Sequence, residues 1–485
     1  SEPRFVASSS CASAGTLRHT MPEGKPVRAA GGFTSGSVPR HLVRLGSYMA
    51  MGSVTMNVAQ LAEAVYLGMV GTEALAAMGF AFPLTIVLFA FAGGIGTGAS
   101  SVIARAAGAG ERETMRRLVT HAQLLAVVVG VLLAIGGVFA ADWMVAALGA
   151  EGEVREMTVR YLKVYMFGVP FFLLGIVGST LLRATGSAAS PGIVMTAGSL
   201  MQIAFGPLLI FGLFGFPELG IAGAALAYVL SRAFSVVLYL GLLVRAKMYE
   251  WSFEDFIGSW KAILHVGGPA IMSGLIHPVS MLVMTRLLAG HGHEVVAGFN
   301  VATRVETMAH MILWSASSSA EPFIGQNWGA NRVDRVRSAL SVVYRFCLAW
   351  GAFTFIVMSL VGALMVSLID DNLVVREVAQ GFFLIIPLTI GMMGVMQVAN
   401  SSFNARGMPM PPLIMTLVRT FAFYIPLCYL GDYLFGYMGI FLASGLVNVV
   451  AGGVAWYWNR RSIERHGAGF GAEQGAGQGG EVRPA

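Results

Sequence analysis

Glu63 is an acidic residue placed well inside the first long apolar segment of the chain, residues 44–67. An ionised carboxylate inside a bilayer costs roughly 2.5–3.5 kcal/mol on insertion scales, so it is expected to face a protein interior. Gln60 and Asn57 precede it at intervals of three residues and would extend a polar stripe along the helix. A carboxyl group in such a place can bind and release a proton. The alternative is a structural polar cluster that joins helices.

A second group of ionisable residues lies within one apolar segment of the other half, residues 296–320. Glu306 and His310 are four residues apart and share a helical face, whereas Arg304 and Glu306 do not. This spacing suits either a proton relay or a charge-compensated structural cluster. His277 precedes a proline in the previous segment, where its ring could bond a backbone carbonyl that the proline leaves free. A packed structural histidine is the other interpretation.

Methionines are abundant, with 27 in the chain, and two of them lie close to polar residues. Met392 and Met396 lie near Gln397 and Asn400 along the chain. Flexible and polarisable methionine side chains can repack around ligands of different shapes. These four residues are therefore candidates for lining a substrate cavity, although most methionines in membrane helices only fill space.

The composition requires a lipid solvent for most of this chain. Of the 485 residues, 56% are hydrophobic and 12% are charged, against roughly 25% charged residues in soluble proteins. The mean hydropathy is +0.71. The three cysteines lie far apart without metal-ligand spacing, which argues against a disulfide framework or a metal site. The glycine-rich run from Gly93 lies inside an apolar segment, so a phosphate-binding loop is excluded.

Twelve apolar segments are each about long enough to cross a bilayer. The chain is therefore predicted to be an all-α membrane protein. The predicted spans are residues 44–67, 77–103, 118–140, 161–182, 190–214, 219–244, 264–288, 296–320, 338–366, 379–403, 410–433 and 435–458.

The remaining segments are polar and suggest tails and a linker. Both ends are rich in Gly, Ser, Arg or Glu and have no apolar core, so they are predicted to be disordered. The predicted organisation is a tail over 1–43, a six-helix bundle over 44–244, a linker over 245–263, a second bundle over 264–458 and a tail over 459–485.

The basic residues predict the orientation of these spans. With the N-terminus placed inside, 23 of the 31 Lys and Arg residues fall in cytoplasmic segments, five fall outside and three lie within spans. This bias is a strong positive-inside signal. Both termini are therefore predicted to be cytoplasmic, in a plasma or inner membrane. The predicted outer loops are acidic, with Asp142, Glu151, Glu153, Asp370 and Asp371.

The second half of the chain repeats the first at an offset of 221 residues. Gly71-Thr-Glu matches Gly292-His-Glu, and Gly108-Ala matches Gly329-Ala. The pair Gly186 and Pro191 matches Gly407 and Pro412 at the same offset. Because each half holds an even number of spans, the halves have the same orientation and are expected to be related by an axis along the membrane normal. Two bundles would then face each other across a central cavity.

Several of these stretches resemble the multidrug and toxic compound extrusion (MATE) family. The stretch Glu63-Ala-Val-Tyr-Leu-Gly resembles its first helix, and Gly96-Thr-Gly-Ala-Ser its second. Pro207-Leu-Leu-Ile-Phe-Gly resembles the fifth helix, and Pro322-Phe-Ile-Gly-Gln-Asn-Trp-Gly-Ala is similar to its most recognisable stretch. The likeness covers residues 42–460. It implies export of organic cations and other amphipathic compounds, driven by inward flow of protons or sodium ions.

The resemblance also bears on individual residues. The family usually has Asp where this chain has Glu63, and Asn and Asp where it has Gln202 and Gly206. The resemblance thus implies a cation-coupling site at Glu63, Gln60, Asn57 and Gln202 that has one carboxylate fewer, which favours protons over sodium ions. A related branch carries a functional Glu near His277. Arg419 resembles an arginine of part of the family, and we interpret it as a counter-charge for Glu306.

The predicted function is therefore secondary active efflux by alternating access. No Walker A sequence or catalytic cluster is present, which argues against an ATP-driven pump or an enzyme. A channel is conceivable, but paired bundles favour alternating access. The nearest alternative is a lipid-linked oligosaccharide flippase. Such flippases usually have more cationic residues lining the central cavity, whereas only three basic residues enter the spans here. We expect no cofactor, no bound metal and no nucleic-acid partner, contacts with membrane lipids, small amphipathic or cationic substrates, and a monomer.

Overall fold

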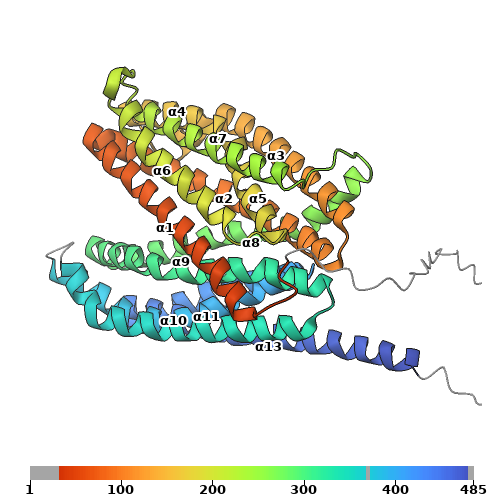
Figure 1. Cartoon of the computed structure of the whole chain (residues 1–485). Helices are drawn as coiled ribbons and strands as arrows, with labels where there is room; N and C mark the ends of the chain where they lie inside the picture. Colours follow the sequence, from red (N-terminus) through yellow and green to blue (C-terminus); the bar gives the residue numbers. More distant parts are fainter. Residues whose placement is uncertain (1–31, 368–371, 479–485) are drawn as a thin grey trace, which may run out of the picture. The chain divides into compact units, whose positions relative to one another are not determined.

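The computed structural model describes residues 32–367 and 372–478, and all regular secondary structure in these ranges is helical. The helices form two groups that follow each other along the chain, here called the first and second lobes (Figure 1). The first lobe comprises α1 (Val38–Val70), α2 (Thr72–Ala109), α3 (Arg112–Ala147), α4 (Gly152–Phe167), α5 (Val169–Ala184), α6 (Ser190–Ile210), the short η1 (Leu213–Gly215) and α7 (Ile221–Arg245).

The second lobe repeats this order with different breaks. It comprises α8 (Phe256–Ala289), α9 (His293–Gly329), α10 (Val333–Ser367), α11 (Leu373–Ala405), α12 (Met410–Leu417), the π-helix η2 (Val418–Tyr424) and α13 (Ile425–Gln478). Each lobe has its own apolar core. Phe172, Leu173 and Tyr165 are buried in the first, and Phe299, Phe382 and Phe441 in the second.

The helices account for the twelve predicted spans. Eight helical stretches are long and apolar enough to cross a membrane, and the bent pair α4 and α5 makes a ninth. That pair turns by 48° next to Pro170, as expected where a proline interrupts a helix. The last stretch, Met410–Arg465, contains a break at Gly436 and therefore provides two spans. The helices α1 and α9 supply the other two. Both are long enough to cross a membrane, but they are less apolar than the eight stretches above.

The two lobes meet through a pair of equivalent contacts, in which the same positions of each lobe touch the other lobe. Gly108 lies against the carbonyl of Gln326, and a Cβ atom at this glycine would overlap that oxygen. Gly329 lies in the same way against the carbonyl of Arg105. Each partner is related to the other by the offset of 221. The lobes are thus related by an approximate two-fold axis, as the repeat predicted.

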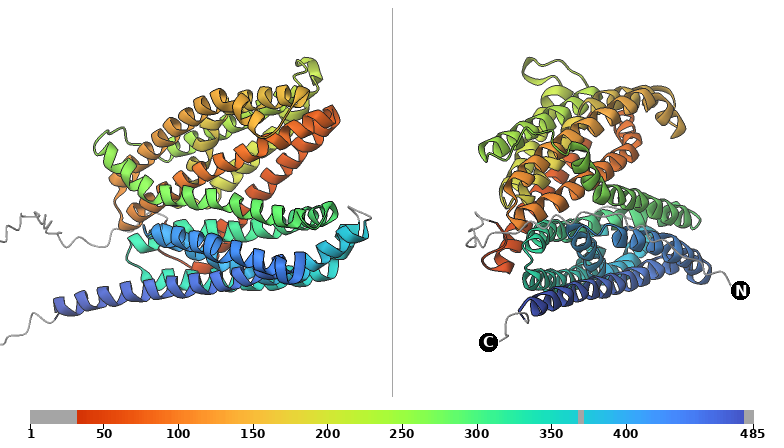
Figure 2. Two further views of the ribbon diagram at one scale, coloured as in Figure 1. Left: turned by 180° about the vertical axis from the view of Figure 1, so that it is seen from behind. Right: turned by 90° about the vertical axis from the view of Figure 1, so that its right-hand side faces the viewer.

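These contacts lie at the end of the lobes where α1 begins and α13 leaves, here called the terminal end (Figure 2). Two hydrogen bonds between the lobes reinforce it. The amide of Gln326 donates to the carbonyl of Ala184 at 2.7 Å, and the hydroxyl of Ser101 donates to the carbonyl of Asn404 at 2.5 Å. Toward the other end the ribbons of the two lobes diverge. The lobes are therefore closed against each other at the terminal end.

The predicted domain boundaries need three corrections. α1 begins at Val38, and Phe33 before it is buried, so residues 32–43 are not a disordered tail. α8 begins at Phe256, inside the predicted linker over 245–263. At the far end α13 continues to Gln478, beyond the predicted boundary at 459. Apolar residues at 33, 38 and 42, which are buried in the second-lobe core, explain the first difference; the glycine-rich sequence after 466 gives no such reason for the last. Residues 1–31, Asp370 and Asp371 lie outside the described ranges.

The ten residues before α8 also pack against the first lobe instead of forming a free linker. The hydroxyl of Tyr249 donates to the Gln123 side chain at 2.7 Å. The ring of His121, which is fully buried, bonds the carbonyl of Ser252 at 2.7 Å. Burial raises the pKa of Tyr249, which therefore stays a hydrogen-bond donor at neutral pH. The connection between the lobes is thus anchored to α3.

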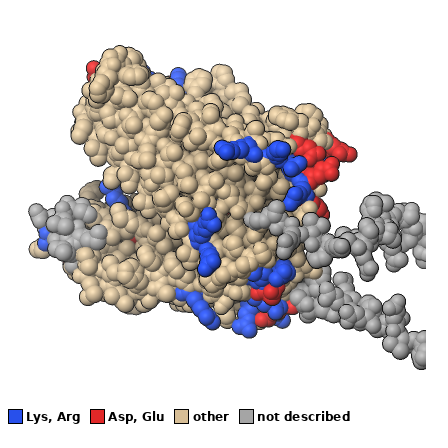
Figure 3. Space-filling model, viewed as in Figure 1, with Lys and Arg blue, Asp and Glu red and all other residues tan. Residues whose placement is uncertain are grey.

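On the visible face most charged side chains gather toward the terminal end, and a few Lys or Arg side chains lie nearer its middle (Figure 3). Most of the exposed large apolar side chains lie on the helices between the two ends, for example Phe82, Leu132 and Val237. A band of exposed apolar residues between charged ends is what a lipid bilayer requires.

Candidate functional site

Glu63 is the centre of a hydrogen-bonded network within the first lobe. Its Oε1 accepts a hydrogen bond from the hydroxyl of Tyr161 on α4 at 3.0 Å. Its Oε2 accepts one from Nε2 of Gln202 on α6 at 2.9 Å. Both donors are almost completely buried. Each carboxylate oxygen therefore has a donor, and three helices are joined at one side chain.

A second layer of contacts holds Gln202 in its orientation. Nη2 of Arg232, on α7, donates to Oε1 of Gln202 at 3.0 Å. The amide oxygen therefore faces the guanidinium and the amide nitrogen faces the carboxylate, because the opposite assignment would pair donors with donors. Arg232 also lies 5.0 Å from the centre of the Tyr228 ring. Its charge is close enough to act on Glu63.

Three tyrosines support the network on one side. The rings of Tyr161 and Tyr165 stack with centroids 5.7 Å apart, and those of Tyr165 and Tyr228 stack at 4.4 Å. Stacked aromatic rings contribute about 0.5–1.5 kcal/mol beyond their burial. This stack fixes the Tyr161 hydroxyl against the carboxylate and supports the guanidinium of Arg232.

A small cavity lies directly beside the carboxylate, lined by Ala59, Glu63, Tyr66, Gln202 and Gly206 among others. It has about 10 Å³ of room, which is close to the least that one water molecule needs. The ring of Tyr66 fills the space where a side chain at residue 206 would begin, since a Cβ atom there would lie 2.9 Å from it. The second carboxylate that the family usually has is therefore replaced by a tyrosine ring.

The predicted polar stripe on α1 does not reach this site. Asn57 donates to the carbonyl of Ser53 at 2.9 Å, one turn earlier on its own helix. Gln60 is exposed, and among the described residues no hydrogen bond joins it to Glu63. Steps of three residues lag behind the helical repeat by about 60° each, so the stripe turns away from the carboxylate. Of the predicted coupling residues, the structure brings together Glu63 and Gln202.

The second lobe holds a different polar cluster. The ring of His310 and the amide nitrogen of Gln397 are 2.8 Å apart. Arg419 lies on the π-helix η2, and its Nη2 donates to Asn448 at 2.8 Å. His277 and Arg419 are close enough to act electrostatically on His310. This cluster is basic and polar, and π-helical turns of this kind are frequent at functional sites.

Glu306 takes no part in that cluster. Among the described residues no hydrogen bond or ion pair is formed by its carboxylate, or by the exposed Arg304. Arg419 bonds Asn448, and its role as a counter-charge for Glu306 stays a prediction. His310 is bonded to Gln397, and a relay from Glu306 to His310 stays a prediction.

The methionine cluster on α11 divides between packing and the polar cluster. Met396 is buried with Phe403 and Met415 in a small apolar core, and Met392 packs against Gly452. Oε1 of Gln397 and Oδ1 of Asn400 are buried, and in the described part of the chain neither has a hydrogen-bond partner. Unsatisfied buried acceptors are uncommon and point to a bound ligand or water. Gln397 and Asn400 are therefore better cavity candidates than the two methionines.

Two members of the first-lobe network were not singled out from the sequence as site residues. Tyr161 lies at the edge of its predicted span, where tyrosines are common for other reasons. Arg232 is one of the three basic residues that lie within the predicted spans. A charge inside a membrane span by itself predicts a functional partner, and this rule was the signal that could have found Arg232.

Comparison with known proteins places this geometry in a family. A model of the MatE family matches residues 49–208 and 269–430, one segment in each lobe. A FAD transporter of Shewanella oneidensis is 31% identical over 439 residues, covering 89% of this chain and 97% of the relative. The probable multidrug resistance protein YoeA of Bacillus subtilis is 25% identical and covers 86% and 93%.

Solved structures agree. The crystal structure of the Vibrio cholerae MATE transporter VcmN in the bent form superposes with a TM-score of 0.84 at 25% identity, covering 88% of this chain and 97% of that one. The outward-facing conformation of a multidrug resistance MATE family transporter has the same TM-score at 24% identity and covers 91% and 99%, which shows the shared fold. The chain is thus a multi-pass membrane transporter and not an enzyme, and it belongs to the MATE family.

Proposed function

We propose that this chain is a secondary active exporter in which Glu63 carries the coupling proton. The observation that supports this proposal is the network in which Glu63 receives hydrogen bonds from Tyr161 and Gln202. These contacts join α1, α4 and α6, and Arg232 on α7 donates a hydrogen bond to Gln202 on the side away from Glu63. Protonation of the carboxyl would weaken its attraction for these donors. A proton could therefore change the packing of three helices in one step.

The same geometry favours a proton over a sodium ion. Hard cations are held by several oxygen ligands. At this site Gln202 presents its amide nitrogen to the carboxylate, because its oxygen is bonded to Arg232. The guanidinium would repel a second cation, and the adjoining cavity has room for about one water. A neutral carboxylic acid, by contrast, fits without any new ligand.

The orientation follows from the basic residues. The terminal end carries Arg112, Arg116, Arg245 and Lys247, so we propose that it faces the cytoplasm and that both termini are cytoplasmic, in a plasma or inner membrane. Contacts between the lobes at this end then close the cytoplasmic side. In such a state Glu63 is placed to receive a proton from the outer side. A monomer is sufficient, since each chain contains both lobes.

Organic cations and other amphipathic drugs are the first proposed substrate class. Relatives named as multidrug resistance proteins or multidrug export proteins support it. A second class, aromatic phosphate-bearing anions, rests on a specific observation. The second-lobe cluster presents Arg419, His277 and His310 together with unsatisfied amide oxygens of Gln397 and Asn400. A FAD transporter among the relatives fits that cluster, and an oligosaccharide flippase is the remaining alternative.

Reconstitution tests these statements together. The purified chain is placed in proteoliposomes, and uptake of ethidium and of FAD is measured under a pH gradient or a sodium gradient imposed separately. Glu63→Gln is the matched control, because it keeps the shape and much of the hydrogen bonding but cannot titrate. We expect uptake with the pH gradient alone and none in the variant. Uptake driven by sodium alone, or equal uptake by the variant, contradicts the proposal, and the preferred compound identifies the substrate class.

A further inference from the structure

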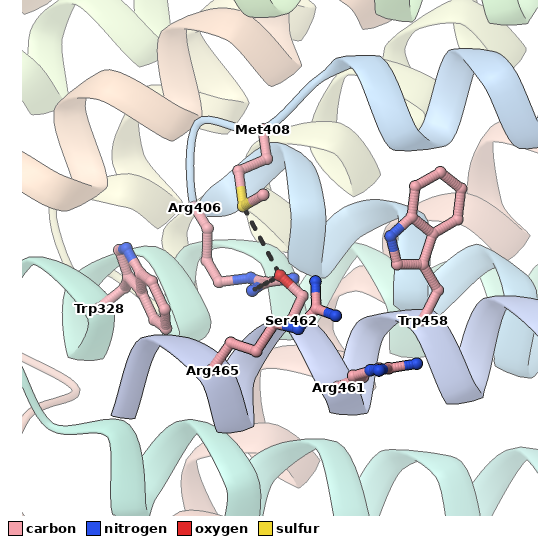
Figure 4. Close-up of a pocket in the computed structure, with 7 residues that line it drawn as sticks. All are labelled: Trp328, Arg406, Met408, Trp458, Arg461, Ser462 and Arg465. Carbon is pink, nitrogen blue, oxygen red and sulfur yellow. Dashed lines mark hydrogen bonds between the residues drawn. The ribbon is translucent and has the colours of Figure 1, made fainter. Parts of the chain in front are cut away.

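A basic pocket lies at the terminal end of the second lobe, away from both clusters described above. It has a volume of about 390 Å³. Its lining combines three arginines with two tryptophans and no acidic residue (Figure 4). The lining residues are Trp328, Arg406, Met408, Trp458, Arg461, Ser462 and Arg465. Neither the family resemblance nor the transport mechanism assigns a role to this pocket.

Arg406 is the innermost of the three cations, with 4% of its surface exposed. Its hydrogen bonds all go to neutral groups: Nε to the Ser402 carbonyl at 3.2 Å, Nη1 to Ser462 at 3.0 Å and Nη2 to Asn459 at 2.6 Å. Its guanidinium lies 5.2 Å from the Trp328 ring centre. No ion pair of Arg406 with a carboxylate occurs among the described residues. A buried charge without a counter-charge is unfavourable, so this one is poised for an anion.

Two further arginines, Arg461 and Arg465 of α13, line the same pocket. Arg461 and Arg465 are four residues apart and follow Trp458 at helical spacing, so all three share one face. Both arginines are exposed, and Nη1 of Arg461 reaches the Tyr457 hydroxyl at 3.1 Å. The neighbouring Arg460 instead pairs with Glu464 at 2.8 Å, outside the pocket lining. Three like charges at one pocket repel each other unless an anion lies between them.

We propose that this pocket binds a phosphate-bearing anion between Arg406, Arg461 and Arg465. Guanidinium groups match the geometry of phosphate oxygens and bind them with charge-assisted hydrogen bonds. The tryptophans supply the apolar walls that a glycerol or other organic substituent of the phosphate would contact. Tryptophan and arginine together are typical of the level at which lipid headgroups lie. A phospholipid headgroup is therefore the favoured source, and free phosphate is the other.

Native mass spectrometry of the purified full-length chain tests this site. Delipidated protein in detergent is titrated with phosphatidylglycerol, or with phosphatidylcholine as the zwitterionic comparison. The test variant is Arg461→Gln with Arg465→Gln, and the charge-matched control is Arg460→Gln with Arg337→Gln. All four arginines are exposed, so both variants are expected to fold. We expect the test variant to bind phosphatidylglycerol about thirtyfold more weakly, and the control to bind it within about twofold of wild type.

Two additional measurements complete the test: competition by inorganic phosphate and quenching of tryptophan fluorescence by a brominated lipid. If millimolar inorganic phosphate displaces phosphatidylglycerol from the wild-type chain, the anion site is supported with free phosphate as its source; absence of displacement supports the lipid. Brominated phosphatidylglycerol should quench tryptophan fluorescence, and Trp458→Phe should remove part of that quenching even if the arginine variants are unstable. Equal lipid binding by the test variant and the control, or quenching that Trp458→Phe leaves unchanged, overturns the proposal.

Discussion

The two lobes are alike where they touch and unlike where they could do chemistry. At the interface Gly108 against Gln326 is repeated by Gly329 against Arg105, with residue numbers that differ by 221. At the same offset Glu63, Tyr161 and Gln202 correspond to Met284, Phe382 and Phe423. The second lobe thus has an apolar or aromatic side chain at each of these three positions. Met284 and Phe382 are buried in its core.

This difference separates the parts that must stay symmetric from those that need not. Two lobes that rock about an axis between them require complementary contact surfaces, which a duplicated sequence provides when both copies keep small residues there. A proton needs one titrating carboxyl, so the second copy is free to change. In its place the second lobe has the basic cluster of His310 and Arg419. We infer that the first lobe couples to the ion and the second contributes more to substrate binding.

The strongest test of this division replaces one intramembrane acid of each lobe, Glu63 in the first and Glu306 in the second. Glu63→Gln should abolish uphill transport, which at a membrane potential of 100 mV is worth about fiftyfold in substrate gradient per charge moved. Glu306→Gln should leave at least about a third of the activity, because the described residues show no partner for Glu306. Both are measured as substrate accumulation in proteoliposomes. Equal losses in the two variants would show that the second lobe also couples.

Substitutions at the interface between the lobes, unlike those of the two acids, should have equal effects in the two lobes. In Gly108→Ala and Gly329→Ala the new Cβ atom overlaps a carbonyl oxygen of the other lobe, so closure at the terminal end is hindered. We expect each variant to lose about tenfold in transport rate, an estimate based on an overpacking cost of roughly 1–3 kcal/mol. The control is Gly93→Ala in α2, where a Cβ atom meets nothing within 4 Å. A large difference between the two variants would refute the symmetric interface.

The sequence was sufficient for the fold because membrane spans and internal repeats are read from hydropathy and spacing alone. Glu63 could be found for the same reason, since a lone carboxylate in an apolar segment is rare. Its partners could not be found, because Tyr161, Gln202 and Arg232 lie on three other helices whose rotation depends on packing. Gln60 and Asn57 make no hydrogen bond to Glu63 among the described residues, because steps of three residues rotate away from it, and their role in coupling stays a prediction. Ala59 and Tyr66, at four and three residues from Glu63, share its face and line its cavity.

The contribution of one donor can be measured by making the first lobe resemble the second. Tyr161→Phe keeps the ring and its stacking on Tyr165 but removes the hydroxyl that bonds Glu63, and it installs the residue type found at Phe382. A hydrogen bond to a charged group contributes about 1.5–3 kcal/mol. Because Gln202 remains, we expect a loss of about three- to tenfold in the initial rate of pH-driven transport. Tyr165→Phe is the control, because it removes a hydroxyl from the same stack without removing the bond to Glu63; a loss as large as that of Tyr161→Phe would contradict a specific role for the bond to Glu63.

The smallest predicted effect concerns the segment before α1, which packs on the second lobe as the segment before α8 packs on the first. The backbone amide of Phe33 donates to Oε1 of Gln326 at 2.8 Å, and the Phe33 ring is 2% exposed. The same Gln326 side chain bonds Ala184 in the first lobe. Gln326 thus joins the docked segment to the first lobe, and the docked segment favours the closed terminal end.

Phe33→Ala should weaken that docking without touching either polar cluster. Truncating a buried phenylalanine costs about 3–5 kcal/mol in a core, and less is expected here because the segment lies at the edge of the lobe. We expect the melting temperature in detergent to fall by several degrees and transport to change by no more than about twofold. Phe82→Ala is the control, since Phe82 is 63% exposed on α2. If both variants melt alike, the segment does not stabilise the closed state; if Phe33→Ala abolishes transport, closure depends on the second lobe far more than the symmetric contacts indicate.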